Sequence, residues 1–502
     1  MKRAFRVLAC LTILVTLGTL LAVMAGGAQK SPAVLERLPH SGGVLMARAI
    51  AAGRVHLPAA RIQPSAATPA VSCSPAPCVL PNVDAAEGGS NPVNEDPIAS
   101  NPNNSSQWIT GGNDYNCTSL QGFFATSDNG TTFTRNCLKT LAGKSGAGDP
   151  GVAYDLNNNV YVTGIDCGSG CATGQIVIAQ STDGGVTFPT PHTAVTSQFS
   201  GLTDKEWMEI DTNTSSPHAG TIYISLTDFS STSKSQITVS RSTDNGATFS
   251  TAKIGSQTSV PAVNQFSDLA VAKDGTVYVS YIFCPGTGPT GDCGSTTATI
   301  LVSKSTDGGV TWSTPVTATT ATLAPDSCGA YYGCLPNTFE RVSDIPVIAV
   351  DNSSGVNAGH LYIAFYHWTG TFMSVRVVSS SDGGTTWSAQ HTVAPSTDTH
   401  DQFFPWVNVS SRGLVGVTFL DRRGDPNNLK YLAFAGVSRD GGLTYINKSI
   451  ATVQSDPNND GFGGGFMGDY TGNTWIKNSL YASWMDTRSG VSQDEVGGLT
   501  LP

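Results

Sequence analysis

The feature that most constrains this chain is an eight-residue pattern that occurs six times. It reads Ser/Thr-x-Asp-x-Gly-x-Thr-aromatic, and successive aspartates lie 55 to 75 residues apart. Recurrence at such a period indicates an array of similar structural units. We call each copy a box; the six boxes are residues 126–133, 181–188, 242–249, 305–312, 380–387 and 438–445.

Each box has the chemistry of a tight turn between two strands. The Asp carboxylate can accept hydrogen bonds from the backbone N–H groups that follow it, and the glycine can adopt a positive φ. A short β-rich run precedes the box, as in residues 176–180, and two further runs precede that one, as in residues 151–155 and 159–163. Four strands per unit predict an all-β fold, a β-propeller of four-stranded blades.

The number of blades follows from the strands outside the boxes. After the sixth box, residues 468–472, 479–484 and 495–501 give three further strands without a box. A fourth strand from residues 78–83 would complete that unit and close the ring. We therefore predict seven blades, with six as the alternative.

The boxes resemble the Asp-box (BNR) repeats of sialidase-like β-propellers, and the resemblance covers residues 82–502. It implies that the box aspartates are structural and lie on the face opposite the active site. It also implies a glycan or glycoconjugate as the partner. The sialidases themselves have six blades, so seven would be a departure.

The N-terminal part of the chain differs in composition from the repeats. Residues 1–28 have a basic start and an apolar run, which predict a signal peptide; an uncleaved membrane anchor is the alternative. Residues 29–81 are rich in Ala, Pro and Ser and predict a weakly ordered linker or pro-segment. The propeller domain is expected over residues 82–502. Membrane contact is expected only through the N-terminal segment.

Charge and cysteine usage bear on partners and compartment. Only 13% of the residues are charged and the net charge is −10, which disfavours nucleic-acid binding. We expect a monomer. Ten cysteines besides Cys10 form close couples, which predict local disulfides and a secreted or extracytoplasmic protein, a metal site being the alternative. The couples are Cys73/Cys78, Cys117/Cys137, Cys167/Cys171, Cys284/Cys293 and Cys328/Cys334.

Candidate binding residues cluster where a propeller's innermost strands begin and its second strands end. These positions share one face, opposite the boxes. In a chain with few charges they form a concentration of carboxylates and arginines, although local capping of strand ends is the alternative interpretation. The predicted substrate-binding residues are Arg341, Arg422, Arg423, Arg488, Asp421, Asp401 and Trp368.

The resemblance also implies a catalytic set. A sialidase needs three arginines on the substrate carboxylate, a Tyr nucleophile beside a Glu, and an Asp acid/base. Here Tyr470 would be the nucleophile, Glu206 its partner, and Asp204 or Asp166 the acid. The Phe/Tyr-Arg-Ile-Pro signature of the first arginine is absent, because the opening blade reads Glu-Asp-Pro-Ile-Ala at residues 95–99.

Three functional hypotheses therefore remain open at this point. The first is a glycoside hydrolase, sialidase-like or using two carboxylates such as Glu206 with Asp401 or Asp421. The second is a non-catalytic propeller that binds glycans or proteins. The third is a structural module of the cell envelope.

No cofactor is expected to be required for any of these functions. One stretch has the alternating oxygen ligands of a calcium loop, at Asp456, Asn458 and Asp460. Met467 stands where such a loop has its bidentate Glu. An ordinary polar turn is the alternative to a structural calcium site.

Overall fold

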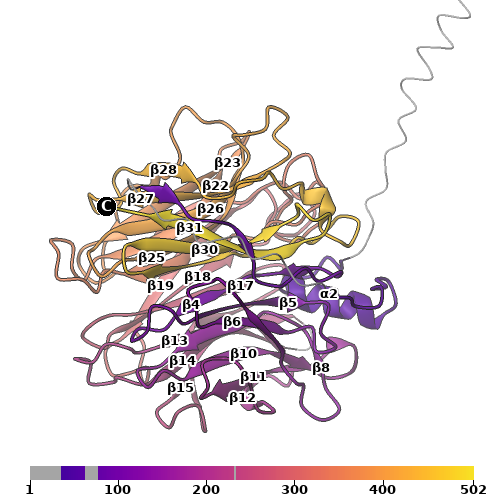
Figure 1. Cartoon of the computed structure of the whole chain (residues 1–502), viewed down its shortest axis with the longest axis horizontal. Coiled ribbons are helices and arrows are strands. Elements are labelled where there is room, and N and C mark those ends of the chain that lie inside the picture. Colours follow the sequence, from indigo (N-terminus) through magenta and orange to yellow (C-terminus); the bar gives the residue numbers. More distant parts are fainter. Residues whose placement is uncertain (1–34, 63–76, 231–232) are drawn as a thin grey trace, which may run out of the picture. The chain divides into compact units, whose positions relative to one another are not determined.

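Seven antiparallel sheets arranged as a β-propeller make up the domain, which confirms the predicted all-β fold and its seven blades (Figure 1). The computed structural model describes residues 35–62, 77–230 and 233–502. The expected signal peptide, Cys10 and Cys73 lie outside these residues. Among the described residues no helix is both long enough and apolar enough to cross a membrane.

The first four blades follow one another along the chain. Each has an innermost strand, two central strands and an outer strand. Blade 1 is β4 (Ile98–Ser100), β5 (Trp108–Asp114), β6 (Gly122–Thr126) and β7 (Thr134–Cys137), with β3 (Val93–Asn94) paired to β5. Blade 2 is β9 (Gly151–Tyr154), β10 (Val160–Cys167), β11 (Gly174–Ser181) and β12 (His192–Thr196), with β8 (Ser145–Gly146) paired to β10. Blade 3 is β13 (Leu202–Ile210), β14 (Ile222–Phe229), β15 (Lys234–Ser242) and β16 (Ser250–Ser259), and blade 4 is β17 (Val263–Val271), β18 (Val277–Cys284), β19 (Thr297–Ser305) and β20 (Val316–Thr322).

The remaining blades complete the ring. Blade 5 is β21 (Val347–Val350), β22 (Leu361–Trp368), β23 (Met373–Ser380) and β24 (His391–Thr392). Blade 6 is β25 (Gln402–Val409), β26 (Val415–Asp421), β27 (Leu432–Ser438) and β28 (Ile446–Ser449). Blade 7 is β29 (Gly472–Ile476), β30 (Ser479–Asp486) and β31 (Gln493–Thr500), with β1 (Cys78–Val79) and β2 (Val83–Asp84) along its outer edge.

The ring is closed by pairing the start of the domain with its end. Cys78 lies opposite Thr500 and Val83 lies opposite Val496, so β1 and β2 both pair with β31. This is the closure predicted from residues 78–83. It covers the outer edge of the last blade, which would otherwise present unpaired backbone groups.

Each box forms the turn between the third and fourth strands of its blade, and the hydrogen bonding repeats six times. In blade 4, Ser305 donates to the Asp307 carboxylate at 2.8 Å and accepts from the Gly309 N–H at 2.8 Å. The N–H and the hydroxyl of Thr311 both donate to Asp307, at 2.9 and 2.6 Å. These hydrogen bonds hold the pKa of Asp307 well below its usual range.

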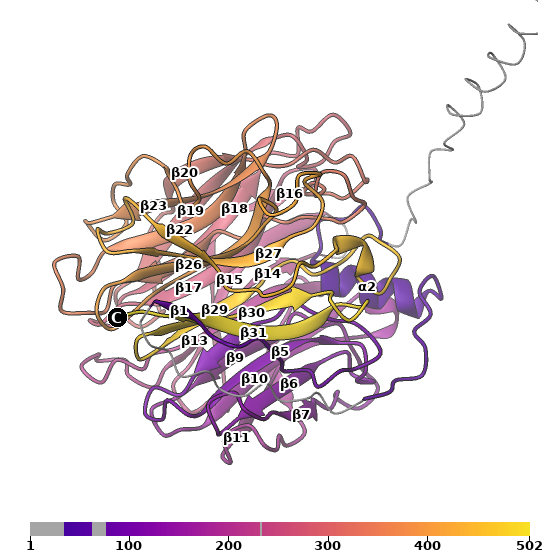
Figure 2. The same cartoon turned by 45° about the horizontal axis from the view of Figure 1, so that its top comes forward.

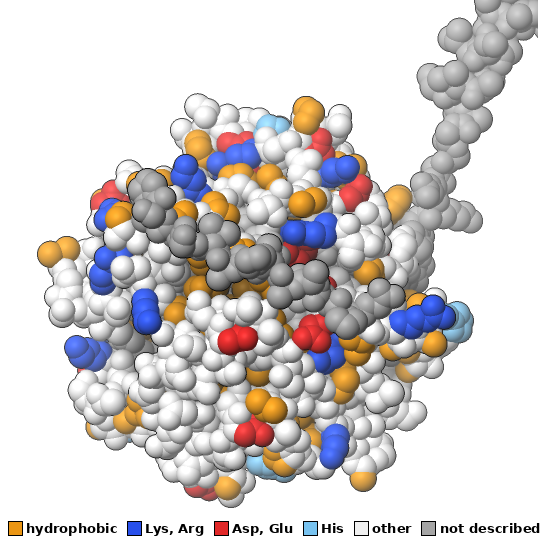
Figure 3. Space-filling view, viewed as in Figure 1, with side chains coloured by type: hydrophobic (Ala, Val, Ile, Leu, Met, Phe, Trp, Pro, Cys, Tyr) orange, Lys and Arg blue, Asp and Glu red, His pale blue; other side chains and the backbone are white. Residues whose placement is uncertain are grey.

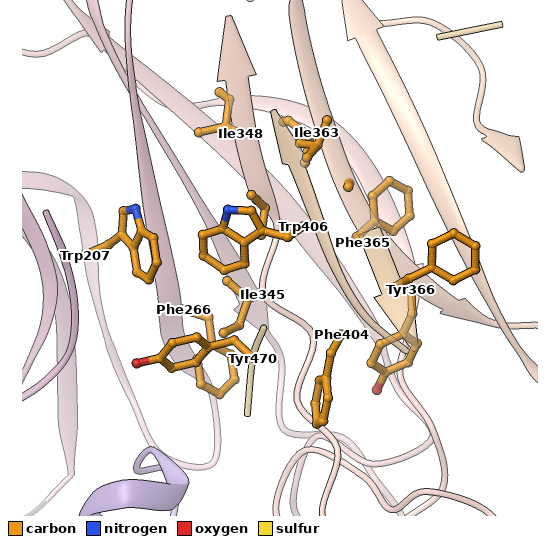
Figure 4. Close-up of a cluster of buried hydrophobic side chains, with 14 of the residues drawn as sticks. Trp207, Phe266, Ile345, Ile348, Ile363, Phe365, Tyr366, Phe404, Trp406 and Tyr470 are labelled. Atoms are coloured by element: carbon orange, nitrogen blue, oxygen red, sulfur yellow. The ribbon is translucent and has the colours of Figure 1, made fainter. Parts of the chain in front are cut away.

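Buried apolar side chains fill the space between the blades, and aromatic residues gather near the axis. Trp207, Trp406 and Tyr470 meet there, from β13, β25 and the segment before β29 (Figure 4). The outer surface carries scattered charges among many uncharged polar side chains (Figure 3), as the low charged content requires.

A helix precedes the propeller strands and packs against them. Helix α2 (Gly42–Ala51) starts at the N-cap Ser41 and lies in the same place, beside the propeller, in Figures 1 and 2. Val44 and Ala47 join the main hydrophobic core, while Met46 and Ala49 pack with Tyr115 and Phe466. This stretch was expected to be a weakly ordered linker. Its apolar stripe is only three turns long and starts with two glycines, so its pattern resembled low-complexity sequence.

The four predicted cysteine couples that lie wholly within the described residues are all disulfides. They are Cys117–Cys137, Cys167–Cys171, Cys284–Cys293 and Cys328–Cys334. Each closes a local loop of the propeller, as predicted. Disulfides of this kind are typical of proteins of oxidising, extracytoplasmic compartments.

Candidate active site

Unusual backbone marks the points where the innermost strands begin. A non-glycine residue with positive φ stands there in five blades: Glu95, Asp149, Lys205, Phe266 and Phe404. In β13, β17 and β25 the strand pairing also shifts register at this point. Such bulges re-aim side chains and are frequent beside functional sites.

These strand starts bring buried charged residues together near the propeller axis. We call this group the axial chamber and define it by Glu95, Asp149, Asp204, Glu206 and Asp469, with Lys205, Arg341 and Tyr470. All eight side chains are almost fully buried. The Asn113 amide donates to Glu95 at 2.8 Å, and its carbonyl oxygen accepts from the Asp149 N–H at 2.9 Å.

Aromatic rings form the floor of the axial chamber. The ring centroids of Trp207 and Trp406 are 4.4 Å apart, and Tyr470 lies edge-on to Trp207 at 5.9 Å (Figure 4). The Lys205 ammonium lies 4.1 Å from the centroid of Tyr470 and 4.8 Å from that of Trp207. Trp207 and Trp406 also line the central channel, a cavity of about 370 Å³. The floor therefore separates the acidic chamber from this channel.

The start of helix α2 occupies the chamber. The Ser41 N–H donates to Asp204 at 2.9 Å, and the Ser41 hydroxyl donates to Asp149. The Gly42 N–H donates to Asp469 at 2.7 Å. Three chamber carboxylates thus bind the positive end of one helix, where free N–H groups and the helix dipole favour anions.

The chamber carboxyls have pKa values that diverge. Burial and the charge of Asp204 raise the pKa of Asp149 to about 7. Burial also raises the pKa of Asp204, but hydrogen bonds from His40 and Ser41 outweigh it and bring that pKa below its usual value. Burial, with the charge of Asp149, raises the pKa of Glu206 well above its usual value. Carboxyls with pKa values shifted in opposite directions are therefore gathered in one chamber.

The four predicted catalytic residues do not all meet. Tyr470, Glu206 and Asp204 lie in the chamber, whereas Asp166 is the last residue but one of β10 and accepts a hydrogen bond from the Leu141 N–H at 2.6 Å. The Tyr470 hydroxyl donates to the Pro150 carbonyl at 3.2 Å. Burial, with the chamber carboxylates, raises the pKa of Tyr470 well above its usual value. This geometry favours a protonated phenol over a phenolate nucleophile.

The predicted arginines are distributed among separate ion pairs. Arg341 pairs with Asp469 inside the chamber, through two nitrogens at 2.8 Å. Outside it, Arg422 pairs with Asp401 at 3.2 Å, Arg423 with Asp421 and Asp398, and Arg488 with Asp486 and Glu495. Trp368 ends β22 and is half-buried against the core. Each guanidinium is thus neutralised by its own carboxylate, and these pairings do not form a shared three-arginine clamp.

The sequence analysis selected neither Glu95 nor Ser41 as a site residue, and it placed Asp149 at the start of an innermost strand without giving it a role. Glu95 and Asp149 had a usable signal, because Glu95-Asp96-Pro97 and Asp149-Pro150 stand at equivalent positions in successive units, just before an innermost strand. Ser41 had none, because it lies outside the repeats and reaches the chamber only through the tertiary fold.

The calcium candidate has the contacts of a polar turn. Asp456 caps the short helix η2 (Pro457–Asn459) by accepting from the Asn458 N–H at 3.0 Å. Asp460 accepts from the N–H groups of Phe462 and Gly464, at 2.8 and 3.0 Å. Both carboxylates are thus engaged by the backbone. Calcium binding here stays a prediction.

Comparisons with known proteins give no family. No protein-family model matches the chain, and no curated protein matches it. Among solved structures the chain is similar to a protein of unknown function from Dyadobacter fermentans DSM 18053. The two are 14% identical with a TM-score of 0.44, over 73% of this chain and 97% of the other protein.

Two glycan-active proteins are among the other similar structures. An ulvan lyase of polysaccharide lyase family PL25 is 12% identical with a TM-score of 0.49, over 82% of this chain and 94% of the lyase. A Hadza microbial sialidase is 16% identical with a TM-score of 0.44, over 77% of this chain and 74% of the sialidase. The chain is therefore identified by its architecture alone, which is a seven-bladed β-propeller.

Proposed function

We propose that this propeller acts on glycans as a glycoside hydrolase whose reacting groups are the chamber carboxyls Asp204 and Asp149. Asp204 is the ionised member and serves as base or nucleophile. Asp149 is the proton donor, since its pKa of about 7 keeps it partly protonated near neutral pH. Export from the cytoplasm, expected from residues 1–28 and consistent with the disulfides, belongs to the same proposal.

The observation that carries the proposal is that one residue contacts both carboxyls. Ser41 donates its N–H to Asp204 and its hydroxyl to Asp149. The contacted carboxyl oxygens therefore lie within about 9 Å of each other, below the upper limit of about 9.5 Å for glycosidase pairs. Opposite protonation of two neighbouring carboxyls is the arrangement that acid/base hydrolysis needs.

The chamber chemistry favours an uncharged sugar over a sialoside. Five carboxyls surround the site, and its two cations are already engaged: Arg341 by Asp469, and Lys205 over the rings of Tyr470 and Trp207. An acidic sugar would meet repulsion without a free guanidinium to bind its carboxylate.

The test is turnover of a panel of fluorogenic glycosides that includes several neutral sugars and one sialoside. Because the α2 segment covers the chamber, we would assay both the wild type and Gly42→Leu. A side chain at residue 42 would overlap the Phe466 ring, with a Cβ placed only 1.9 Å from it. Asp204→Asn and Asp149→Asn are then compared in whichever background is active.

We expect turnover of a neutral glycoside, and a loss of at least about 100-fold in kcat/KM in either Asn variant. Asp228→Asn is the matched control, because Asp228 lies near the end of β14 and accepts hydrogen bonds from Ser197 and Gln198 rather than from chamber groups. Sialoside turnover, or Asn variants that retain activity, would contradict the proposed pair. Silence across the panel from folded protein would favour the binding hypothesis, which a glycan array on Gly42→Leu would examine.

A further inference from the structure

Residues 36–51, which we call the plug, contact the chamber and neighbouring loops of the propeller at several points. Besides the contacts of Ser41 and Gly42, the Pro39 carbonyl accepts from the Tyr332 hydroxyl at 2.8 Å. The His40 carbonyl accepts from Arg341 at 3.2 Å. At the other end, Arg48 donates to the Cys171 carbonyl at 3.3 Å. The plug is thus bound by several blades at once.

The plug supplies the kind of groups that a polar substrate would supply. Its N–H and hydroxyl donors satisfy the oxygens of Asp149, Asp204 and Asp469, which would otherwise face one another as like charges. Below them Glu206, which is fully buried, has no hydrogen-bond partner for either carboxyl oxygen among the described residues. The chamber therefore contains carboxyl oxygens to which the plug donates no hydrogen bond.

The propeller ring is complete without the plug. All seven sheets are built from residues 78–500, and the ring is closed by β1 and β2 pairing with β31. Within the described part of residues 35–62, the only strand-like pairing is one isolated bridge between Ile62 and Gly89. Removing the plug from the chamber would break side-chain and helix-end contacts but no sheet.

We propose that residues 36–51 are a built-in inhibitor that closes the axial chamber, and that the chamber opens when this segment is displaced. The inference rests on the proposed function only in naming the closed chamber as the reacting site. The closure itself depends on contacts that can be tested without a substrate.

The test uses the full chain and the chemical reactivity of Lys205, a fully buried chamber residue whose ammonium lies over the Tyr470 ring. Gly42→Leu is designed to unseat the helix, because residue 42 touches the Phe466 ring. Ala51→Leu adds the same side chain at an exposed position of the same helix and is the matched control. Acetylation of lysines by a small acylating reagent is mapped by mass spectrometry.

Displacement of the plug should raise the labelling rate of Lys205 at least about tenfold in Gly42→Leu, with the wild type and Ala51→Leu protected. Protected Lys205 in a folded Gly42→Leu would overturn the proposal. Turnover of glycosides is measured separately on the same samples. A chamber that opens but shows no turnover would refute the proposed function, while the closure of the chamber by the plug would still be supported.

If Gly42→Leu does not fold, a second variant decides. A recognition sequence for a site-specific protease is inserted between Ile62 and Gln63, and the purified full chain is cut there. Release of the plug from the folded ring, and its rebinding in competition with a synthetic peptide of residues 35–62, would support the proposal. Co-elution of the cut segment until the ring itself unfolds would show a permanent structural part and overturn it.

Discussion

The two faces of this propeller use carboxylates in opposite ways. The box aspartates are near the surface, repeat one hydrogen-bond pattern six times, and have pKa values below the usual value, as the Thr248, Ser242 and backbone contacts of Asp244 lower its pKa to about 2. The chamber carboxyls are buried, have different partners in each blade, and mostly have raised pKa values. Aspartates on the box face are thus ionised and stabilise turns, whereas most chamber carboxyls keep their protons to higher pH. The reason is that the box aspartates accept several hydrogen bonds near the surface, while burial dominates for the chamber carboxyls.

The largest expected effect of a single substitution comes from removing one partner of a buried ion pair in the chamber. Arg341→Met would leave the buried Asp469 carboxylate without its guanidinium, and we expect a loss of about 3 kcal/mol in the free energy of unfolding. Urea denaturation measures it. The double variant Arg341→Met/Asp469→Leu should recover most of the loss, and Arg412→Met, at an exposed arginine, should change stability by less than about 0.5 kcal/mol. A single variant as stable as the wild type would show that the hydrogen bond from the Gly42 N–H of the plug is enough to stabilise Asp469.

The pH dependence of stability sharpens the comparison. Burial raises the pKa of Asp149, Asp268 and Asp494 to about 7 and that of Glu209 to about 8. The folded state therefore holds these protons more tightly than the unfolded state, so stability is full below about pH 4 for these groups and falls as pH rises to about 8. Each such group loses about 1.4 kcal/mol per pH unit between its unfolded and folded pKa values, so we expect the free energy of unfolding to drop by several kcal/mol between pH 5 and pH 8.

The box aspartates should act in the opposite direction. Their lowered pKa values contribute stability that is present above about pH 4 and is lost as pH falls toward about 2. Urea midpoints measured from pH 2 to pH 9 should therefore pass through a maximum near pH 4 to 5. Asp268→Asn should flatten the alkaline side only. A midpoint that rises from pH 5 to pH 8 would contradict the raised pKa values.

The smallest expected effect concerns a single box. Asp440→Ala removes the acceptor of Ser438 and of the Thr444 N–H and hydroxyl, at 2.7, 3.0 and 2.6 Å. Because the turn stays solvated, we expect a loss of about 1 kcal/mol, measured by thermal unfolding. Leu443→Thr in the same turn is the control, since the Leu443 side chain is half exposed and only its backbone N–H, which the substitution keeps, donates to Asp440. A loss above about 3 kcal/mol would mean that the box also anchors its neighbouring blade.

Much of the chamber could be anticipated from position within the repeat. Glu206, Asp204 and Tyr470 were selected because they precede an innermost strand, and the structure places them together. Asp166 was selected by the same argument from the end of a second strand, and it contacts Leu141 instead. The repeat gives the face on which a residue lies but not its distance from the axis, since that depends on the bulges of β13, β17 and β25.

The sequence by itself determined the boxes, the four-strand unit, the seven blades and the four disulfides seen here, because each follows from local turn chemistry or from neighbours in the chain. Only the tertiary structure decided what fills the chamber. The contacts of Ser41 with Asp149 and Asp204 join residues more than a hundred positions apart. No periodic pattern records such a contact, since one short helix outside the repeat reaches several blades at once through the geometry of the closed ring.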